Sequence, residues 1–261
     1  MPLIKYNLND HMVEYDNGEF EVCYCLGNDY LHYIGNGKNI HNPKGNTSCY
    51  AMFHNFKGTS LDLSNFNTHN ITNMGSMFAN CSNLESLNLE NFDTHNVTDM
   101  SYMFSYCYNL KHLSLSKFNT SNVISMKSMF YNCENLKSLN TSRFNTKKVE
   151  NMCCMFEYCT SLKILNLSNF KTNNVTKLRE MFFNCHELKE LDLSSFNIYD
   201  GIYLSEFDNM FYGCSSLETL KVSSDCLQFF SDYKKALFEE CGNVNIIPVS
   251  KLDKAIEELF Y

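Results

Sequence analysis

Hydrophobic residues recur along this chain at a fixed spacing, and mostly polar residues fill the intervals between them. The clearest unit occupies residues 87–112 and has the sequence LNLENFDTHNVTDMSYMFSYCYNLKH. Its Met-Phe pair returns every 26 residues, with outer copies 25 residues before and 29 residues after the regular run: Met52, Met77, Met103, Met129, Met155, Met181 and Met210. A period this regular predicts an array of stacked structural repeats.

Three further residue types keep the same register. Phenylalanine recurs at Phe66, Phe92, Phe118, Phe144, Phe170 and Phe196. Cysteine recurs at Cys81, Cys107, Cys133, Cys159, Cys185 and Cys214. Leucine recurs at Leu84, Leu110, Leu136, Leu162, Leu188 and Leu217. These columns predict that each side chain packs on its own copy in the next repeat, which gives a continuous core.

Within one unit the spacing of the hydrophobic residues changes. Leu87 and Leu89 alternate with polar residues, which predicts a short strand with both leucines on one face. The later hydrophobic residues follow the i, i+3, i+4, i+7 stripe of a helix: Met100, Met103, Phe104 and Cys107. Thr98 precedes this stripe as the expected N-cap. Each unit is therefore predicted to run through a strand, a bend, a short helix and a return.

Neither element can bury its hydrophobic side alone, and stacking of the units buries both. Strands of successive units are expected to pair in parallel, about 4.8 Å apart. The predicted fold class is α/β: a leucine-rich-repeat solenoid with one short parallel strand and one short helix per 26-residue repeat, capped at both ends.

Two segments outside the repeat are expected to cap the solenoid. Residues 1–50 hold short alternating runs broken by turn pairs, which predicts hairpins of an N-terminal cap. The solenoid itself is expected to span residues 51–220. Residues 221–261 are predicted to form a C-terminal helical cap, with a strand at 243–249 between helices at 227–240 and 251–261.

The unit that starts at Leu191 contains three extra residues, around Asp200, Gly201 and Ile202. An insertion in one repeat maps to a loop, and such loops often lie on a binding face. We favour the simpler interpretation, a bulge near the end of the array, and keep a functional loop as the alternative.

Composition argues against several classes of partner. The chain has 261 residues, of which 44% are hydrophobic, a formal net charge of −8 and a pI near 5.5. We therefore expect neither a nucleic acid nor an anionic membrane as partner. The basic cluster of Arg143, Lys147 and Lys148 is interpreted as a solvated patch rather than a phosphate or glycan site. No stretch approaches the roughly 20 apolar residues of a membrane span, so membrane insertion is not expected.

Thirteen cysteines raise the question of disulfides. Six of them occupy one column on the buried side of the predicted helix, where a thiol acts as a small apolar filler. The odd total also favours free thiols, and oxidation between neighbouring repeats stays open as the alternative. Cys153 and Cys154 are adjacent but have no CxxC partner pair, so the signal for a metal site is weak.

Histidines and catalytic motifs add no predicted site. His69 and His95 are one period apart and are expected on adjacent repeats, where we favour a solvated pair over a shared metal ion. The chain contains no glycine-rich phosphate loop, HExxH motif or nucleophile elbow. A repeat lattice rarely builds a pocket of convergent polar residues. We therefore expect no enzymatic activity, no catalytic residue, no metal and no cofactor.

The outward-facing residues of the strands form the predicted protein-binding surface. The strand-face column is the middle outward position of each repeat: Asp62, Asn88, Ser114, Asn140, Asn166 and Asp192. A second outward column lies beside it: Ser86, His112, Ser138, Ile164 and Glu190. Such regular polar ladders suit an extended contact with a protein. Tyrosines near the predicted helices either form a rival surface or shield the helix packing: Tyr102, Tyr106, Tyr108, Tyr131 and Tyr158.

The repeated phrase Leu-x-Leu-Ser-x-Phe-x-Thr-x-x-Val-Thr-x-Met-x-x-Met-Phe-x-x-Cys resembles the BspA-like leucine-rich-repeat family. This family contains the 26-residue repeats of bacterial surface proteins, which also occur in mycoplasma lipoproteins and in some protists. The copy at residues 165–185, LNLSNFKTNNVTKLREMFFNC, shows the resemblance well, with Leu178 where other copies have Met. The resemblance covers about residues 50–220 and implies a curved leucine-rich solenoid.

The same resemblance implies a cell-surface protein with a role in adhesion or other protein binding. The N-terminus, MPLIKYNLNDHMVEYD, lacks the basic start and apolar core of a secretory signal, which favours the cytoplasm, so the compartment stays open. The leading hypothesis is a non-enzymatic binding module with an unidentified protein partner. The alternative is a structural or self-associating array protein without a dedicated ligand.

Overall fold

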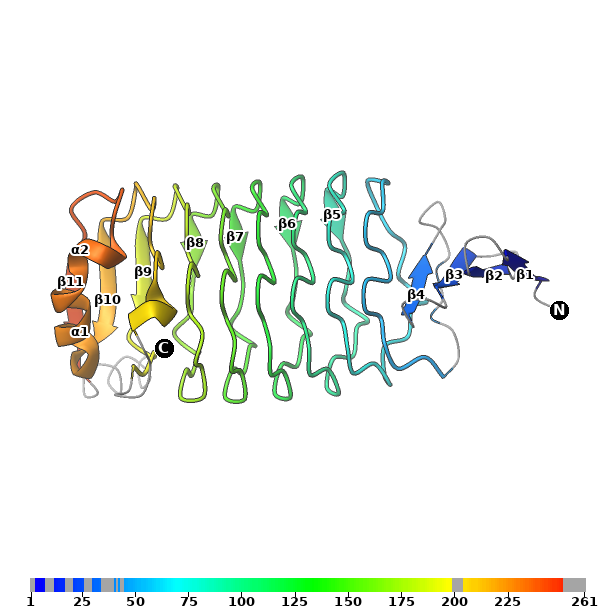
Figure 1. The fold of residues 1–261 in the computed structure, drawn as a ribbon, viewed down its shortest axis with the longest axis horizontal. Helices are drawn as coiled ribbons and strands as arrows, with labels where there is room; N and C mark the ends of the chain where they lie inside the picture. The colour runs from blue at the N-terminus through cyan, green and yellow to red at the C-terminus, as the bar shows by residue number, and fades with distance from the viewer. Residues whose placement is uncertain are drawn as a thin grey trace.

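The computed structural model describes residues 3–7, 12–16, 21–25, 30–33, 40, 42, 45–198 and 204–250. Figure 1 shows an elongated solenoid in which successive turns of the chain lie side by side along the long axis. The leucine-rich-repeat solenoid with one short parallel strand per repeat is therefore confirmed.

The parallel strands begin at β5 (Ser86–Leu87) and continue through β6 (His112–Leu113), β7 (Ser138–Leu139), β8 (Ile164–Leu165) and β9 (Glu190–Leu193) to β10 (Thr219–Ser223) and β11 (Asn245–Val249). Parallel pairing joins β5 to β6, β7 to β8, and β9 to β10 to β11. A second line of parallel bridges runs through the return segments: Ser48, Asn73, Asp99, Ser125, Asn151 and Lys177. Two ladders therefore hold each repeat to the next.

The N-terminal segment is antiparallel where the rest of the chain is parallel. Its strands are β1 (Leu3–Asn7), β2 (Met12–Asp16), β3 (Glu21–Cys25) and β4 (Tyr30–Tyr33), and they pair in chain order. This arrangement agrees with the hairpins predicted for the segment. Tyr33 connects it to the solenoid, because the Tyr33 backbone N–H donates to the Met52 carbonyl oxygen at 2.6 Å and its ring packs against Phe53.

The expected helix in each repeat is wrong. Tyr102 and Tyr106 have positive φ angles of 59°, which an α-helix does not tolerate. Backbone N–H groups alternate between a turn bond and the next repeat: Ser105 donates to Tyr102, whereas Phe104 donates to the carbonyl of Met129 at 2.9 Å. The segment is a run of tight turns, and such turns place hydrophobic residues inward at nearly the same offsets as a helix.

The predicted helix cap at Thr98 is replaced by a contact between repeats. The Thr98 hydroxyl donates to the Thr72 carbonyl oxygen one repeat earlier. A second, buried threonine column makes two bonds per residue: the Thr120 Oγ1 donates to the Asn145 carbonyl oxygen at 3.1 Å and accepts from the Asn145 N–H at 2.7 Å. Threonine therefore connects repeats instead of starting helices.

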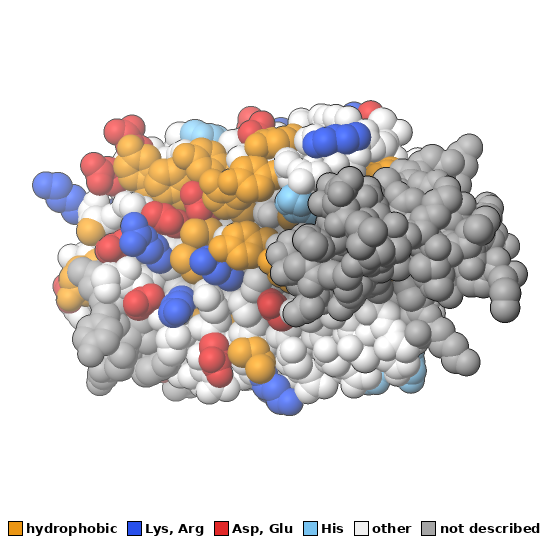
Figure 2. All heavy atoms as spheres, turned by 45° about the vertical axis from the view of Figure 1, so that its right-hand side comes forward, with side chains coloured by type: hydrophobic (Ala, Val, Ile, Leu, Met, Phe, Trp, Pro, Cys, Tyr) orange, Lys and Arg blue, Asp and Glu red, His pale blue; other side chains and the backbone are white. Residues whose placement is uncertain are grey.

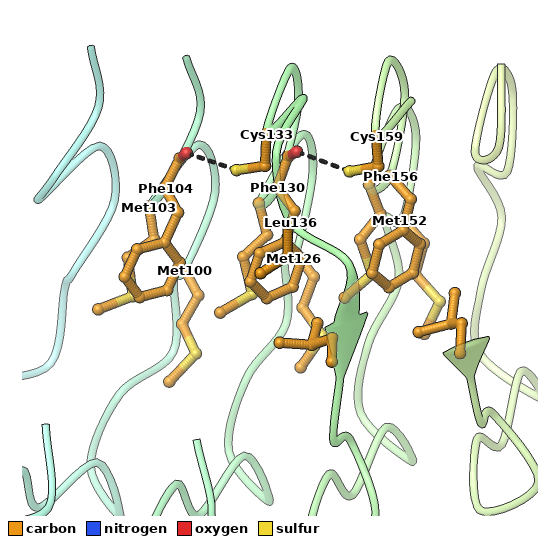
Figure 3. Packing of buried hydrophobic residues seen from close by; sticks show 14 of the residues in the cluster. Met100, Met103, Phe104, Met126, Phe130, Cys133, Leu136, Met152, Phe156 and Cys159 are labelled. Atoms are coloured by element: carbon orange, nitrogen blue, oxygen red, sulfur yellow. Dashed lines mark hydrogen bonds between the residues drawn. The ribbon is translucent and has the colours of Figure 1, made fainter. Parts of the chain in front are cut away.

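The phenylalanine and cysteine columns form the centre of the core, as predicted. The rings of Phe104 and Phe130 lie nearly parallel, with an interplanar angle of 6° and centroids 5.7 Å apart. Each thiol of the cysteine column donates to a carbonyl of the preceding repeat, as Cys159 does to Phe130 at 3.2 Å (Figure 3). The thiol thus satisfies a buried backbone oxygen in addition to filling space.

The C-terminal segment begins with two 3₁₀ helices, η1 (Leu204–Phe207) and η2 (Ser224–Cys226). The helix expected at 227–240 is two short helices, α1 (Leu227–Asp232) and α2 (Lys234–Leu237). The expected strand is present as β11, and the helix expected at 251–261 lies outside the described residues.

Repeat-like stacking continues beyond residue 220. Phe238 stacks on Phe211 with centroids 4.9 Å apart, and the Cys241 thiol donates to the Phe211 carbonyl at 2.9 Å. These two residues extend the phenylalanine and cysteine columns by one turn, and β11 adds the matching strand.

Candidate functional site

The strand-face column is exposed at five of its six positions, and Asp192 is half-buried. Most of these side chains also have a structural role. The Asn140 Oδ1 accepts from the Ser142 N–H at 3.0 Å, and the Asn166 Oδ1 accepts from the Ser168 N–H at 2.9 Å. The same bond occurs at Asp62, Asn88 and Asp192. Each such bond ends a strand by closing a turn.

Ser114 departs from this pattern. Its hydroxyl donates to the Glu90 Oε1 at 3.1 Å, so it faces a side chain of the previous repeat. The structural role of the other positions was missed in the sequence analysis. The available signal was Asp or Asn two residues before the turn residue that donates the N–H, as in Asp62-Leu63-Ser64.

The column beside it contains the most exposed large hydrophobic side chain among the described residues. Ile164 is 70% exposed, where the other repeats have Ser86, His112 and Ser138. It lies in a hollow of about 570 Å³ on the outer side of β8, β9 and β10. The polar side chains of this hollow carry both charges: Lys163, Lys189, Glu190, Asp192 and Lys221.

A second surface follows the turn segments. Four ring contacts connect five aromatic side chains of successive repeats, with centroids 4.9–6.1 Å apart: Tyr106, Tyr131, Tyr158, Phe183 and Tyr212. Tyr106 is exposed and the others are half-buried. Burial, together with the hydrogen bond to Tyr106, raises the pKa of Tyr131. We call this set the aromatic ladder; it corresponds to the rival tyrosine surface of the sequence analysis.

Hydrophobic side chains also gather in a band along the long axis of the molecule, with charged side chains between them (Figure 2). The basic cluster is exposed at all three positions, and the Lys148 ammonium donates to the Asn122 Oδ1 at 2.7 Å. The insertion at Asp200 lies outside the described residues.

His69 and His95 are adjacent, as their spacing predicted, with ring centroids 5.2 Å apart. The sequence analysis missed the group between them. The two Nδ1 atoms lie 2.9 and 2.6 Å from the two carboxylate oxygens of Asp93. Partial burial alone would raise the pKa of Asp93, but the hydrogen bonds from His95 and His69 outweigh it and lower the pKa to about 2. The three side chains are largely exposed and form a charged surface cluster.

A second group with metal-ligand chemistry lies around Cys154. Its sulfur and one carboxylate oxygen each of Glu157 and Glu180 lie within 4.8 Å of one another. Among the residues that the structure describes, every helix is too short or too polar to serve as a membrane-spanning segment.

Comparison with known proteins gives one family. Residues 47–161 and 132–246 match a family described as a Mycoplasma protein of unknown function, DUF285. The crystal structure of a leucine rich cell surface protein from Faecalibacterium prausnitzii A2-165 is similar to this chain at 15% sequence identity and a TM-score of 0.44, over 91% of this chain and 76% of that one. No curated protein matches the chain.

Proposed function

The chain belongs to the DUF285 family, and we propose that it is a non-enzymatic solenoid that binds a protein partner through its strand face. Membership of this family agrees with the resemblance of the repeats to the BspA-like type. The proposed site is the strand-face column together with the hollow around Ile164.

The exposure of Ile164 carries the proposal. A side chain of this kind that is 70% exposed gains free energy when a partner covers it, about 1.5–3 kcal/mol for full burial. Acidic and basic groups surround it in the same hollow, which suits a partner surface of mixed charge. Ile247 on β11 adds a second exposed hydrophobic side chain to the strand face, because its register partner on β10 is Lys221.

The strand-face column supplies the polar part of the contact. Its oxygens are engaged in turns, but the amide nitrogens of Asn88, Asn140 and Asn166 donate to none of the described residues. Repeated at successive turns of the solenoid, these donors match acceptors spaced along an extended partner segment.

The non-enzymatic part of the proposal rests on the chemistry of this face. Its hollow is lined by lysines, carboxylates and hydroxyl groups without a histidine or a cysteine. A catalytic site would need a nucleophile or general base held by an orienting partner.

We propose that the protein acts at the cell surface, in adhesion or another recognition role. Fractionation of expressing cells, followed by protease treatment of intact cells, tests this location. Degradation of the protein on intact cells is expected, and protection until the cells are lysed would contradict the surface role.

The binding face is tested by site-specific photo-crosslinking. A photoreactive amino acid at position 164 is expected to capture one defined protein, such as an extracellular matrix protein offered as ligand. Position 124 is a matched control, because Ile124 is 44% exposed but lies outside the hollow. A crosslink at position 106 of the aromatic ladder, without one at position 164, would place the interface on the rival surface.

The alternative function, a self-associating array, predicts that position 164 crosslinks to a second copy of this chain. Sedimentation analysis separates the two, because Ile164→Arg would then shift the protein to monomers while Ile124→Arg would not. A monomeric wild-type chain counts against the array.

We also propose that residues 1–50 and 221–261 cap the solenoid of residues 51–220. Limited proteolysis is expected to cut first in the outer segments and to leave the repeats intact. Early cleavage within 51–220 would contradict these limits.

A further inference from the structure

Cys153 and Cys154 lie beside two glutamates that come from the same turn and from the next repeat. Glu157 follows three residues later, and Glu180 occupies the position of Cys154 one repeat on, 26 residues further along the chain. Cys154 and Glu180 share the same unusual backbone, each with a φ of 57°. The solenoid therefore superposes these two side chains on adjacent turns.

The donor atoms have the spacing of a tetrahedral metal site. The Cys153 and Cys154 sulfurs are 3.4 Å apart, and the Cys154 sulfur is 3.6 Å from the Glu180 Oε2. Zinc bonds of 2.3 Å to sulfur and 2.0–2.2 Å to oxygen place tetrahedral donors roughly 3.4–3.8 Å apart. A Glu157 oxygen lies within 4.8 Å of the Cys154 sulfur and the Glu180 carboxylate. Two sulfurs and two oxygens can therefore converge through small side-chain rotations.

The neighbouring repeats lack this combination. Serine stands at the position of Cys153 in one earlier repeat, Ser101, and at the position of Cys154 in the repeat before it, Ser128. The position of Glu157 is occupied by Tyr131 before it and Phe183 after it. Repeat architecture alone thus requires neither the thiols nor the buried carboxylate.

The charges around the site leave room for a cation. Glu157 is only 8% exposed and has no ion pair among the described residues. Burial raises the pKa of its carboxyl group. Arg179 engages the Oε1 of Glu180 at 3.3 Å, so the Oε2 is left to face Cys154. The hydrogen bond between the sulfurs lowers the pKa of Cys153 and raises that of Cys154.

We propose that Cys153, Cys154, Glu157 and Glu180 form a site for a thiophilic divalent cation, with Zn²⁺ as the natural occupant. The cation binds two thiolate sulfurs and two carboxylate oxygens and displaces the protons held by the thiols. It ties two adjacent repeats together and neutralises the buried Glu157. Hard cations such as Ca²⁺ are excluded by the thiolate ligands. The site is independent of the strand face, so its test does not depend on partner binding.

Cadmium titration of the reduced full chain tests the site, because a thiolate-to-cadmium absorption band reports sulfur ligation only. We expect one equivalent of Cd²⁺ to produce the band, Zn²⁺ to abolish it by competition, and Ca²⁺ to leave it unchanged. Affinity should rise with pH, since thiol protons are released. The His69 cluster contributes no sulfur and does not interfere with this measurement.

Variants identify the ligands. Cys153→Ser with Cys154→Ser should remove the band, and these changes introduce the residue that neighbouring repeats already carry. Glu180→Gln should weaken Cd²⁺ binding by roughly 10-fold or more while the protein stays folded by circular dichroism. Cys241→Ser, which removes a half-buried thiol elsewhere, is the matched control. An unchanged band in the double serine variant, its loss in Cys241→Ser, or no stoichiometric band in the wild type would overturn the proposal.

Discussion

The Cys133 thiol donates a hydrogen bond to the Phe104 carbonyl oxygen at 3.1 Å, and every cysteine of its column repeats this contact one turn along (Figure 3). Cys133 is fully buried, and burial raises the pKa of its thiol to about 12. The column therefore consists of neutral thiols that act as donors between repeats.

Replacement of Cys133 by Ala should lower the free energy of unfolding by about 1–3 kcal/mol, because the Phe104 carbonyl loses a buried donor. Cys133→Asp should cost several kcal/mol more or prevent folding, since it buries an unpaired charge. Urea unfolding followed by circular dichroism measures both changes. Melting of Cys133→Asp like the wild type would show that the column is not buried.

The threonine column gives a second prediction. Thr120→Val keeps the shape of the side chain but leaves the Asn145 N–H and carbonyl without their partner, at a cost of about 2–4 kcal/mol. Thr98→Val is the matched control, because the Thr98 hydroxyl bond is exposed to solvent and its loss should cost well under 1 kcal/mol. Equal effects of the two substitutions in urea unfolding would contradict the role assigned to the buried column.

Asn140 separates turn stability from binding. Asn140→Ala should lower stability by about 0.5–1.5 kcal/mol, because the Ser142 N–H loses its acceptor. Asn140→Asp retains a side-chain oxygen at that position and should keep the turn. If the strand face binds the partner, Asn140→Asp should weaken the complex without destabilising the free protein, since it removes the amide donor. Thermal melting and a binding titration of the two variants distinguish the roles.

Periodicity was sufficient to predict the solenoid, the buried columns and the adjacency of His69 and His95. It did not distinguish a helix from successive turns, because both place hydrophobic residues inward at offsets of three and four. The positive φ at Tyr106 decides between them, and Tyr gives no sign of that backbone conformation. The last turn, with Phe238 and Cys241, was missed because the intervening helices α1 and α2 hide the period.

The candidate site was less predictable than the fold. Asp93 and Glu157 acquire their roles from contacts across repeats and from burial, which a single sequence does not display. The adjacency of Cys153 and Cys154 was visible, but the spacing rules for metal ligands assume ligands close in sequence. In a repeat protein the relevant neighbour is one period away, as Glu180 is from Cys154.

The Asp93 cluster predicts a specific pH dependence. Its carboxyl pKa is lowered from 3.8 to about 2 in the folded protein, so the unfolded chain takes up the proton first as the pH falls. The stabilisation is complete above pH 3.8 and is lost as the pH approaches 2. Because the carboxylate is 41% exposed, solvent screening limits the effect to less than about 1 kcal/mol. Asp93→Asn should therefore be less stable than wild type near neutral pH, and this difference in urea midpoint should vanish at the acid end.

The additional turn at the C-terminal end predicts where truncation of a side chain is costly. Phe238 is 7% exposed and stacks on Phe211, so Phe238→Ala should lower stability by about 3–5 kcal/mol through the cavity it leaves. Tyr233→Ala is the matched control, since Tyr233 is 39% exposed and much of its surface already faces water. Hydrogen exchange should locate the loss at β10 and β11, because each repeat is stabilised mainly by its neighbours. An effect of Phe238→Ala no larger than that of Tyr233→Ala would mean that stacking ends at Phe211.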